Sequence, residues 1–252
     1  MSEKQGENVG NGDLHKHIRQ YQELVGSDIH FAFQTIMDSA ALDVVAFEAL
    51  VRGIRGEPAA TVISRIDHDQ RFAFDQACRI RAIEAASRNE LDADLHLNCS
   101  DVKPANVELV CAVILHMARR YGIERERIVL ELANLDTLCS RGQLDEVSKG
   151  FADAGLRTLA DNFGRRNADL RPVALFRPEQ LKLDRHLVQA IDQNLPHQAI
   201  VHASARLCRD LGIRLIAAGV ETIEEFQWLQ DAGIERFQGY FFSHPGLDEE
   251  NI

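Results

Sequence analysis

Short apolar runs with strand character recur eight times along the chain, and this repetition constrains the fold more than any other feature. The runs cover residues 29–37, 44–51, 95–99, 127–132, 156–160, 180–183, 213–218 and 236–242. Segments of helical periodicity precede and separate them, several ending at glycine, over residues 14–25, 74–88, 107–122, 144–155, 197–212 and 222–233. Strands that alternate with helices in this way predict an α/β fold.

The length of the chain favours a closed barrel over the alternative, an open doubly wound sheet. The chain has 252 residues, and one (β/α)8 barrel typically needs roughly 250. No G-x-G-x-x-G follows an early strand and no GK[ST] occurs, so neither phosphate-binding loop of the nucleotide folds is supported. We therefore predict a single TIM-like (β/α)8 barrel over residues 13–252, after a polar, disordered lead over residues 1–12.

Charge and hydropathy narrow the classes of partner. The formal net charge is -11, which disfavours binding to the phosphate backbone of nucleic acids. No run approaches the ~18 apolar residues of a membrane span, and the start of the sequence resembles neither a secretory signal nor a transit peptide. The five cysteines are odd in number and form no CxxC, so we expect buried thiols. A cytoplasmic protein that does not bind membranes is expected.

Polar side chains fall at or near the carboxyl ends of the predicted strands, where a hydrophobic core does not require them. In a barrel these ends converge on one face, where active sites are built. Carboxylate and amide oxygens are the ligands that Mg²⁺ and Mn²⁺ prefer. The sequence therefore predicts a functional face with a metal site, formed by Glu48, Asn98, Glu131, Asp161, Lys182 and Gln238.

Taken singly, each of these residues has a simpler interpretation. Glu48 alone would be a solvated rim residue, and Asn98 alone a turn residue that bonds its own backbone. Asp161 would be a helix cap, and Lys182 a surface or salt-bridged lysine. Their combination on successive strands favours the metal site.

Seven motifs in order, beginning with FEALVR at residues 47–52, resemble the signatures of the EAL domain family. The others are LNCS, LELAN, LADNFG, LKLD, AAGVE and FQGYFFSHP, and the resemblance covers roughly residues 28–246. Residues 56–86 further resemble EAL domains that are coupled to blue-light sensors, although this sequence contains no sensor domain. The resemblance implies a stand-alone EAL-type barrel.

Members of this family hydrolyse cyclic di-GMP to linear pGpG with two divalent ions that flank the phosphate. By position, the resemblance makes four residues ligands of the first ion: Glu48, Asn98, Glu131 and Asp161. It makes Lys182 the residue that orients the attacking water, Arg52 a phosphate contact, and Glu221 and Gln238 further pocket residues. Glu48, Lys182 and Glu221 would be the remnant of the catalytic set.

The half of the site that would hold the second ion departs from the family pattern. Asn162 stands where the family has a second aspartate, and Ala218 where it has a glutamate. Asn134 replaces another glutamate, and the loop that it would anchor has become GRRNAD, residues 164–169. The family's five carboxylates would give about -5 against two ions, whereas about -3 remains here, which suits one Mg²⁺ or Mn²⁺.

These departures predict a catalytically degenerate domain. Loss of one ion in two-metal phosphoryl chemistry lowers the rate on the order of 10³-fold or more. We expect a regulatory module of bacterial cyclic-di-GMP signalling that binds a partner protein and takes up the nucleotide without turnover. The alternative is a weak metal-dependent phosphodiesterase that produces pGpG.

The sequence does not identify the surface that would contact a partner protein. Arginines at positions 165, 166, 171 and 177 near the barrel mouth are either solvated or contact an acidic partner or nucleotide phosphates. A homodimer is left open too, since the region that mediates dimer contacts in the family is the one that has diverged.

Overall fold

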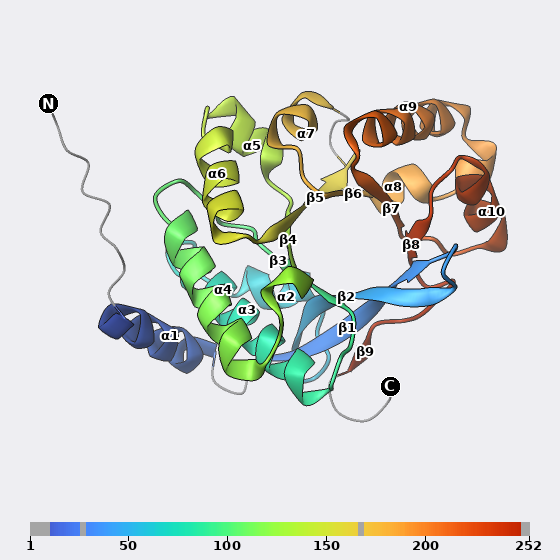
Figure 1. The fold of residues 1–252 in the computed structure, drawn as a ribbon. Helices are drawn as coiled ribbons and strands as arrows, with labels where there is room; N and C mark the ends of the chain where they lie inside the picture. Colours follow the sequence, from blue (N-terminus) through green and yellow to red (C-terminus); the bar gives the residue numbers. More distant parts are fainter. Residues whose placement is uncertain (1–10, 26–28, 166–168, 248–252) are drawn as a thin grey trace, which may run out of the picture.

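Eight strands close into a barrel in the computed structural model, which describes residues 11–25, 29–165 and 169–247 (Figure 1). The strands are β1 (Ile29–Asp38), β2 (Asp43–Gly53), β3 (Asp94–Asn98), β4 (Ile128–Leu132), β5 (Arg157–Phe163), β6 (Gln180–Leu183), β7 (Arg214–Ala218), β8 (Arg236–Gln238) and the short β9 (Gly246–Leu247). The barrel and all eight predicted strands are confirmed. Residues 1–10 of the predicted lead lie outside the described ranges, and the first helix begins at Asn11.

The direction of β1 distinguishes this barrel from one in which all strands are parallel. Neighbours from β2 to β8 pair in parallel, whereas β1 is antiparallel to both β2 and β8 and closes the barrel between them. β9 pairs with β1 at Ala32 and Phe33. Neither feature was predicted, because hydrophobic periodicity carries no information on strand direction.

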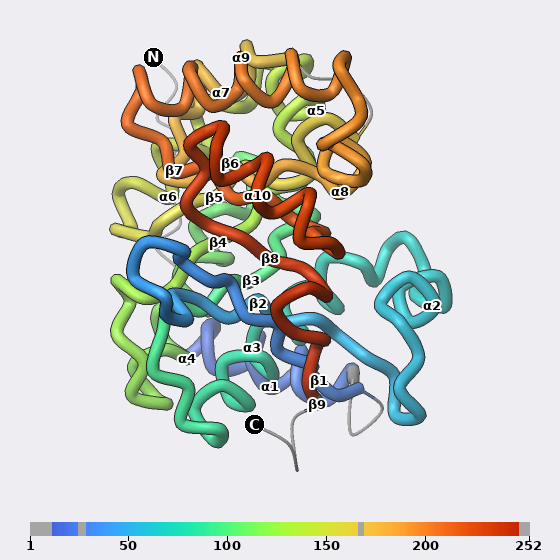
Figure 2. Tube along the Cα trace, turned by 90° about the vertical axis from the view of Figure 1, so that its right-hand side faces the viewer, coloured from blue at the N-terminus to red at the C-terminus, as the bar shows by residue number. Residues whose placement is uncertain are grey.

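The helices pack outside the barrel, and Figure 2 shows α1 at the end opposite α9. They are α1 (Asn11–Val25), α2 (Ala59–Ser64), α3 (Arg71–Arg88), α4 (Val107–Tyr121), α5 (Leu135–Ser140), α6 (Leu144–Ala154), α7 (Arg171–Phe176), α8 (Arg185–Val188), α9 (Leu195–Leu211) and α10 (Ile223–Asp231), with 3-10 turns η1 (Arg125–Arg127) and η2 (Ile191–Gln193). As predicted, left-handed glycines follow α4, α6 and α9, at positions 122, 155 and 212.

A small apolar layer fills the inside of the barrel. One residue from each of five strands contributes to it, and each is fully buried: Ile36, Ala46, Val129, Leu159 and Ile216. A much larger cluster lies between the strands and the helices. Because side chains alternate along a strand, the residue two positions beyond each inner residue of the parallel strands also points into the barrel, one layer higher. In the antiparallel β1, the corresponding residue lies two positions before the inner one.

The cysteines and the helices bear on two further expectations. All five cysteines are free, and three of them are buried. The expectation of buried thiols is wrong for Cys78 and Cys139, which are half-buried because each packs at the edge of the main core. Within the described ranges, no helix combines the length and the apolar character that crossing a bilayer requires.

Candidate functional site

The predicted polar residues form a layer directly above the apolar interior of the barrel. Two positions after Ala46 comes Glu48, two after Val129 comes Glu131, and two after Leu159 comes Asp161. β1 runs in the opposite direction, so its contribution, Gln34, lies two positions before Ile36. The strand period thus places these polar groups at one height, where the apolar filling ends.

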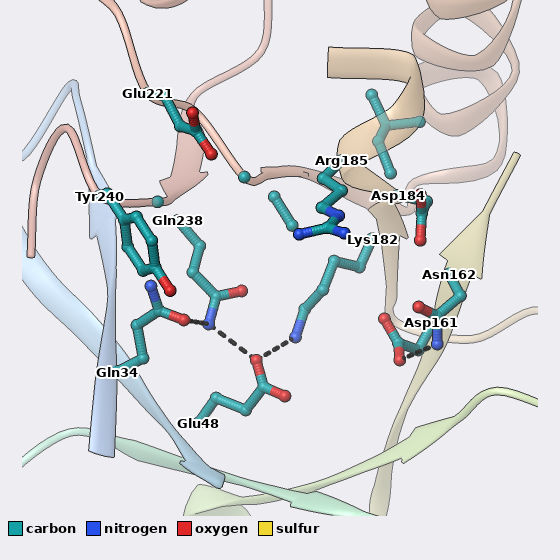
Figure 3. A pocket seen from close by; sticks show the side chains of 14 residues that line it. Gln34, Glu48, Asp161, Asn162, Lys182, Asp184, Arg185, Glu221, Gln238 and Tyr240 are labelled. Carbon is teal, nitrogen blue, oxygen red and sulfur yellow. Dashed lines mark hydrogen bonds and ion pairs between the residues drawn. The ribbon is translucent and has the colours of Figure 1, made fainter. Parts of the chain in front are cut away.

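Lys182 lies at the centre of this layer and joins two glutamates. Its Nζ donates to Glu48 Oε2 at 2.9 Å and to Glu131 Oε1 at 2.5 Å, and its side chain is only 4% exposed. Gln238 Nε2 donates to Glu48 Oε2 at 2.7 Å, and Asn98 Nδ2 donates to Glu48 Oε1 at 3.4 Å. Four predicted residues from four strands therefore meet at Glu48, as Figure 3 shows in part.

The two glutamates that share Lys182 have opposite electrostatic character. Burial alone would raise the pKa of Glu48, but the ammonium of Lys182 and the bond from Gln238 outweigh burial and lower it to about 2. Burial and the nearby charge of Glu48 raise the pKa of Glu131 to about 8. Lys182 thus bonds both carboxylates, whereas burial and the charge of Glu48 make ionisation of Glu131 unfavourable.

His96 completes the buried network from below. Its Nδ1 lies 2.8 Å from Glu131 Oε1, and burial together with the charge of Lys182 lowers the pKa of the ring to about 3. The ring is therefore neutral, and its Nδ1 shares a hydrogen bond with Glu131 Oε1. The sequence interpretation did not include His96 in the site, although it lies two positions before Asn98 on one face of β3.

Gln34 is a second residue that the sequence interpretation missed. Its Oε1 accepts from Gln238 Nε2 at 3.3 Å, so it links β1 to the Glu48 network. An isolated amide on the inward face of an otherwise apolar strand was the available signal, and it could be read only once the inward face of β1 was known.

Asp161 and Asn162 lie at an irregularity of β5, where the pairing with β6 shifts between Ala160 and Phe163. Asn162 adopts a left-handed conformation with φ of 58°, and its Nδ2 donates to Asp161 Oδ2 at 2.5 Å. Burial, and then the charges of Glu131 and Glu48, raise the pKa of Asp161 to about 7, although Lys182 opposes them. Asp161 was expected just after the strand, but the irregularity extends β5 past it.

A cavity of about 260 Å³ opens above this layer (Figure 3). It contains the two altered positions of the second-ion side, Asn162 and Ala218, together with Asp161 and Glu48. Glu221 lies exposed at its rim, where its backbone amide donates to Glu225 Oε2. These two departures from the family pattern thus face one pocket.

A larger cavity of about 900 Å³ adjoins the first and shares Glu48, Asp161 and Asn162 with it. Its wall includes Asn98 and Asn134 and several apolar side chains of α3 and β2. Five basic side chains also line it: His68, Arg71, Arg79, Lys103 and Arg141. The two cavities together give a continuous, partly basic space across the carboxyl ends of the strands.

Two predicted positions do not line the two cavities described above. Arg52, towards the end of β2, donates to its neighbour's carbonyl at Val51 and is not among the residues that line the described cavities. Arg165 lines a third cavity of about 330 Å³ with Asn134 and Asp169, whereas Arg166 lies outside the described residues.

β2 continues to Gly53, so Glu48 is in mid-strand and not at its end as predicted, because β1 pairs with β2 over that whole length.

The site offers a hard cation oxygen ligands without a finished coordination shell. Among the described side chains, no group of three or more His, Cys, Asp or Glu is arranged to hold a metal ion. Glu131 Oε2, however, is buried without a hydrogen-bond partner, and an unsatisfied carboxylate oxygen suits Mg²⁺ or Mn²⁺. These oxygens fit one divalent ion when the ammonium of Lys182 moves away from one of the two glutamates that it bonds.

Comparisons with known proteins give one consistent result. A family model described as "EAL domain" matches residues 18–245. The chain is 32% identical to a standalone versatile EAL protein from Vibrio cholerae O395, solved in a c-di-GMP bound form, with a TM-score of 0.80 over 88% of this chain and 93% of that one. It is 31% identical to Klebsiella pneumoniae BlrP1, solved as a calcium/cy-diGMP complex, with a TM-score of 0.82 over 91% of this chain and 58% of that one.

A curated relative carries a regulatory name. The blue light- and temperature-regulated antirepressor BluF of Escherichia coli K12 is 29% identical over 220 residues, which are 87% of this chain and 55% of that protein. The probable cyclic di-GMP phosphodiesterase PdeN of the same strain is 26% identical over 86% of this chain and 43% of its own length. The chain thus spans about half the length of these relatives.

Proposed function

The chain belongs to the EAL domain family, and on that premise we propose that it is a catalytically degenerate regulatory module of cyclic-di-GMP signalling. In this proposal it acts in the cytoplasm through a partner protein and binds the nucleotide without hydrolysing it. The relatives bear names of both kinds, an antirepressor and a phosphodiesterase. The names of the relatives therefore do not distinguish regulation from catalysis, and the choice between them rests on the residues of the site.

One observation carries the proposal: Asn162 and Ala218 face the same cavity as Asp161. Each stands where the resemblance predicts a carboxylate for the second ion, so that side of the pocket has lost two negative charges. In addition, Asn162 donates to Asp161 Oδ2, which occupies an oxygen that a bridging ligand would offer to a cation. A second divalent ion would meet too little charge and too few oxygens.

The residues that remain could hold one divalent ion. Glu48, Glu131, Asp161 and Asn98 would be its ligands, and when bound it would polarise a phosphate oxygen. Lys182 holds the two glutamates in place through its bonds of 2.9 and 2.5 Å. Positioning of a phosphate is thereby retained, whereas stabilisation of both the attacking and the leaving oxygen is not.

The shape and charge of the two cavities support nucleotide binding. The larger has a volume of about 900 Å³, within the range of sites that enclose small molecules. Its basic side chains, including Arg71 and Arg141, suit phosphate oxygens, and its apolar wall suits a base. We propose that the dinucleotide lies across both cavities.

Weak metal-dependent phosphodiesterase activity, with pGpG as product, is the second candidate. It is favoured by the intact network of Lys182, Glu48 and Glu131. Calorimetric titration of cyclic di-GMP in Mg²⁺, with product analysis for pGpG over hours, tests both candidates. Binding with turnover at least about 10³-fold below an intact family member is expected; turnover near that of such a member contradicts the regulatory proposal.

Restoring carboxylates at positions 162 and 218 tests directly whether their loss explains the proposed absence of catalysis. We expect Asn162→Asp combined with Ala218→Glu to raise pGpG production on the order of 10²-fold or more with Mn²⁺, because a second ion regains its ligands. The matched control is Asn162→Asp with Ala218→Gln, which has the size of the glutamate without its charge. Equal rates for both double variants would count against a charge-based loss and would implicate the altered loop, residues 164–169.

A further inference from the structure

A cationic side chain on the Ala218 side of the site is not used by the function proposed above. Arg185 follows β6 directly after Asp184, and Figure 3 shows its guanidinium pointing into the pocket above Lys182. Among the residues whose placement is described, no hydrogen bond or ion pair engages this guanidinium. Its charge therefore faces the space that a ligand would occupy.

The backbone around Arg185 fixes where its side chain begins. Asp184 Oδ1 accepts from the amide of His186 at 2.9 Å, which holds the turn that carries Arg185. On the other side lies Gly219, with φ of 82°, where an added Cβ would come within 2.4 Å of the Cβ of Arg185. The stem of Arg185 is thus packed against the backbone that follows Ala218.

Neither of the two altered second-ion positions supplies Arg185 with a counter-charge. Ala218 and Asn162 line the same cavity and carry no charge. Lys182, the other cation of the cavity, is already bonded to two glutamates. The exposed Glu221 lies at the rim and forms no ion pair with Arg185 within 4.0 Å.

From this arrangement we infer that Arg185 binds a phosphate of the cyclic dinucleotide on the Ala218 side of the pocket. There it supplies the positive charge that a second divalent ion would otherwise supply, so that binding persists without that ion. A guanidinium suits this task, since its planar fork can donate to two phosphate oxygens at once. The inference rests on the proposed nucleotide binding and adds the residue and the metal independence.

The test is a calorimetric titration of cyclic di-GMP in EDTA and, separately, in Mg²⁺. We expect the wild-type chain to bind in EDTA, and Arg185→Ala to weaken that binding about 10- to 100-fold, or about 1.4–2.8 kcal/mol. Arg185→Lys keeps the charge but loses the fork, and a loss of less than about tenfold is expected. Arg206→Ala on α9, whose side chain is 84% exposed, is the control and leaves affinity unchanged.

Ala218→Glu gives a second readout in which the sign of the effect reverses. In EDTA the new carboxylate pairs with Arg185, and the affinity for the nucleotide falls on the order of tenfold. In Mn²⁺ the same carboxylate favours an ion, and the affinity recovers. An effect of the same size and sign under both conditions overturns the inference.

Two outcomes separate this inference from the proposed function. If the wild-type chain binds in Mg²⁺ but not in EDTA, or if Arg185→Ala binds in EDTA as tightly as wild type, Arg185 does not replace an ion and only this inference fails. If the wild-type chain binds under neither condition, the nucleotide-binding part of the proposed function fails with it. Thermal melting of each variant shows that the fold is intact.

Discussion

At the scale of single residues, one lysine balances two glutamates inside the barrel. Removing one partner of a buried ion pair is far more harmful than the net worth of the pair suggests, because a charge is left without compensation. Glu48 and Glu131 would both lose their cation if Lys182 were replaced. The lysine therefore stabilises the fold as well as fixing the positions of the two glutamates.

We expect Lys182→Met to lower the free energy of unfolding by about 3–5 kcal/mol at pH 8. The loss should be smaller at pH 5, where the raised pKa values of Glu131 and Asp161, about 8 and about 7, leave both carboxyls protonated in the folded chain. Urea unfolding in EDTA at the two pH values measures the difference.

The sign of this pH effect follows from linkage. A carboxyl whose pKa is raised by folding binds its proton more tightly in the native state, so stability falls as the pH rises from about 4.5 to about 8. Glu48, with a lowered pKa of about 2, stabilises the folded chain above about pH 4.5 and loses this effect as the pH falls towards 2.

Lys103→Met, which removes an exposed ion pair with Asp101, is the control and should change the free energy of unfolding by less than about 0.5 kcal/mol. Equal losses for Lys182→Met at both pH values would contradict this account.

The sequence was sufficient to predict which residues meet but not how they meet. Glu48, Asn98, Glu131 and Lys182 were correctly expected on one face because parallel strands end together. That Lys182 bonds two of the expected metal ligands could not be predicted, since side-chain distances depend on strand register and barrel closure. Arg185 was missed because a helix-starting arginine has no periodicity that marks it as pointing inward.

At the scale of elements, a buried arginine ties α3 to the end of β3. Arg79 is fully buried and donates to Asp75 Oδ2 at 2.6 Å, to the carbonyl of Asn98 at 3.0 Å and to Gln76 Oε1 at 2.8 Å. Asp75 in turn accepts from the amide of Ser100 at 3.1 Å. The loop that follows Asn98 is thus held by the helix beside it.

The sequence predicted a helix over residues 74–88 but could not show that one of its arginines points inward.

Replacement of this arginine should loosen the loop after β3. We expect Arg79→Met to lower the free energy of unfolding by about 2–4 kcal/mol, because Asp75 and the Asn98 carbonyl lose their buried partner. Adding Asp75→Asn should recover part of the loss, as the uncompensated charge is removed. Chemical denaturation of the single and double variants measures both values, and Arg206→Ala serves as an exposed control. No recovery in the double variant would mean that packing, and not charge, is what Arg79 provides.

At the scale of the whole molecule, closure by an antiparallel first strand makes the barrel one cooperative unit. β1 pairs with both β2 and β8, so the two ends of the strand order are joined through it. Ile36 of β1 is fully buried and contacts the inner layer formed with β2, β4, β5 and β7. The direction of β1 could not be predicted from the sequence, because it depends on how the complete sheet closes.

Shortening the side chain at the closing strand should destabilise the chain as a unit. We expect Ile36→Ala to cost about 2–5 kcal/mol, through lost burial and the cavity left behind. The fluorescence of Trp228 on α10, the single tryptophan, and far-UV circular dichroism should report the same midpoint. Leu195→Ala, at a side chain that is 75% exposed, is the control and should leave the midpoint nearly unchanged. Two separate midpoints for Ile36→Ala would contradict a single cooperative unit.

The left-handed backbone at Asn162 has a consequence for how such a domain can change its role. Asparagine and aspartate are the two side chains, besides glycine, that adopt this conformation readily. Exchange of one for the other removes a charge from the pocket while the irregularity of β5 keeps its shape. An exchange between aspartate and asparagine at this position is therefore expected to change the charge of the pocket without lowering the stability of the barrel, so that one of the two missing carboxylates can be lost or regained by a protein that stays folded.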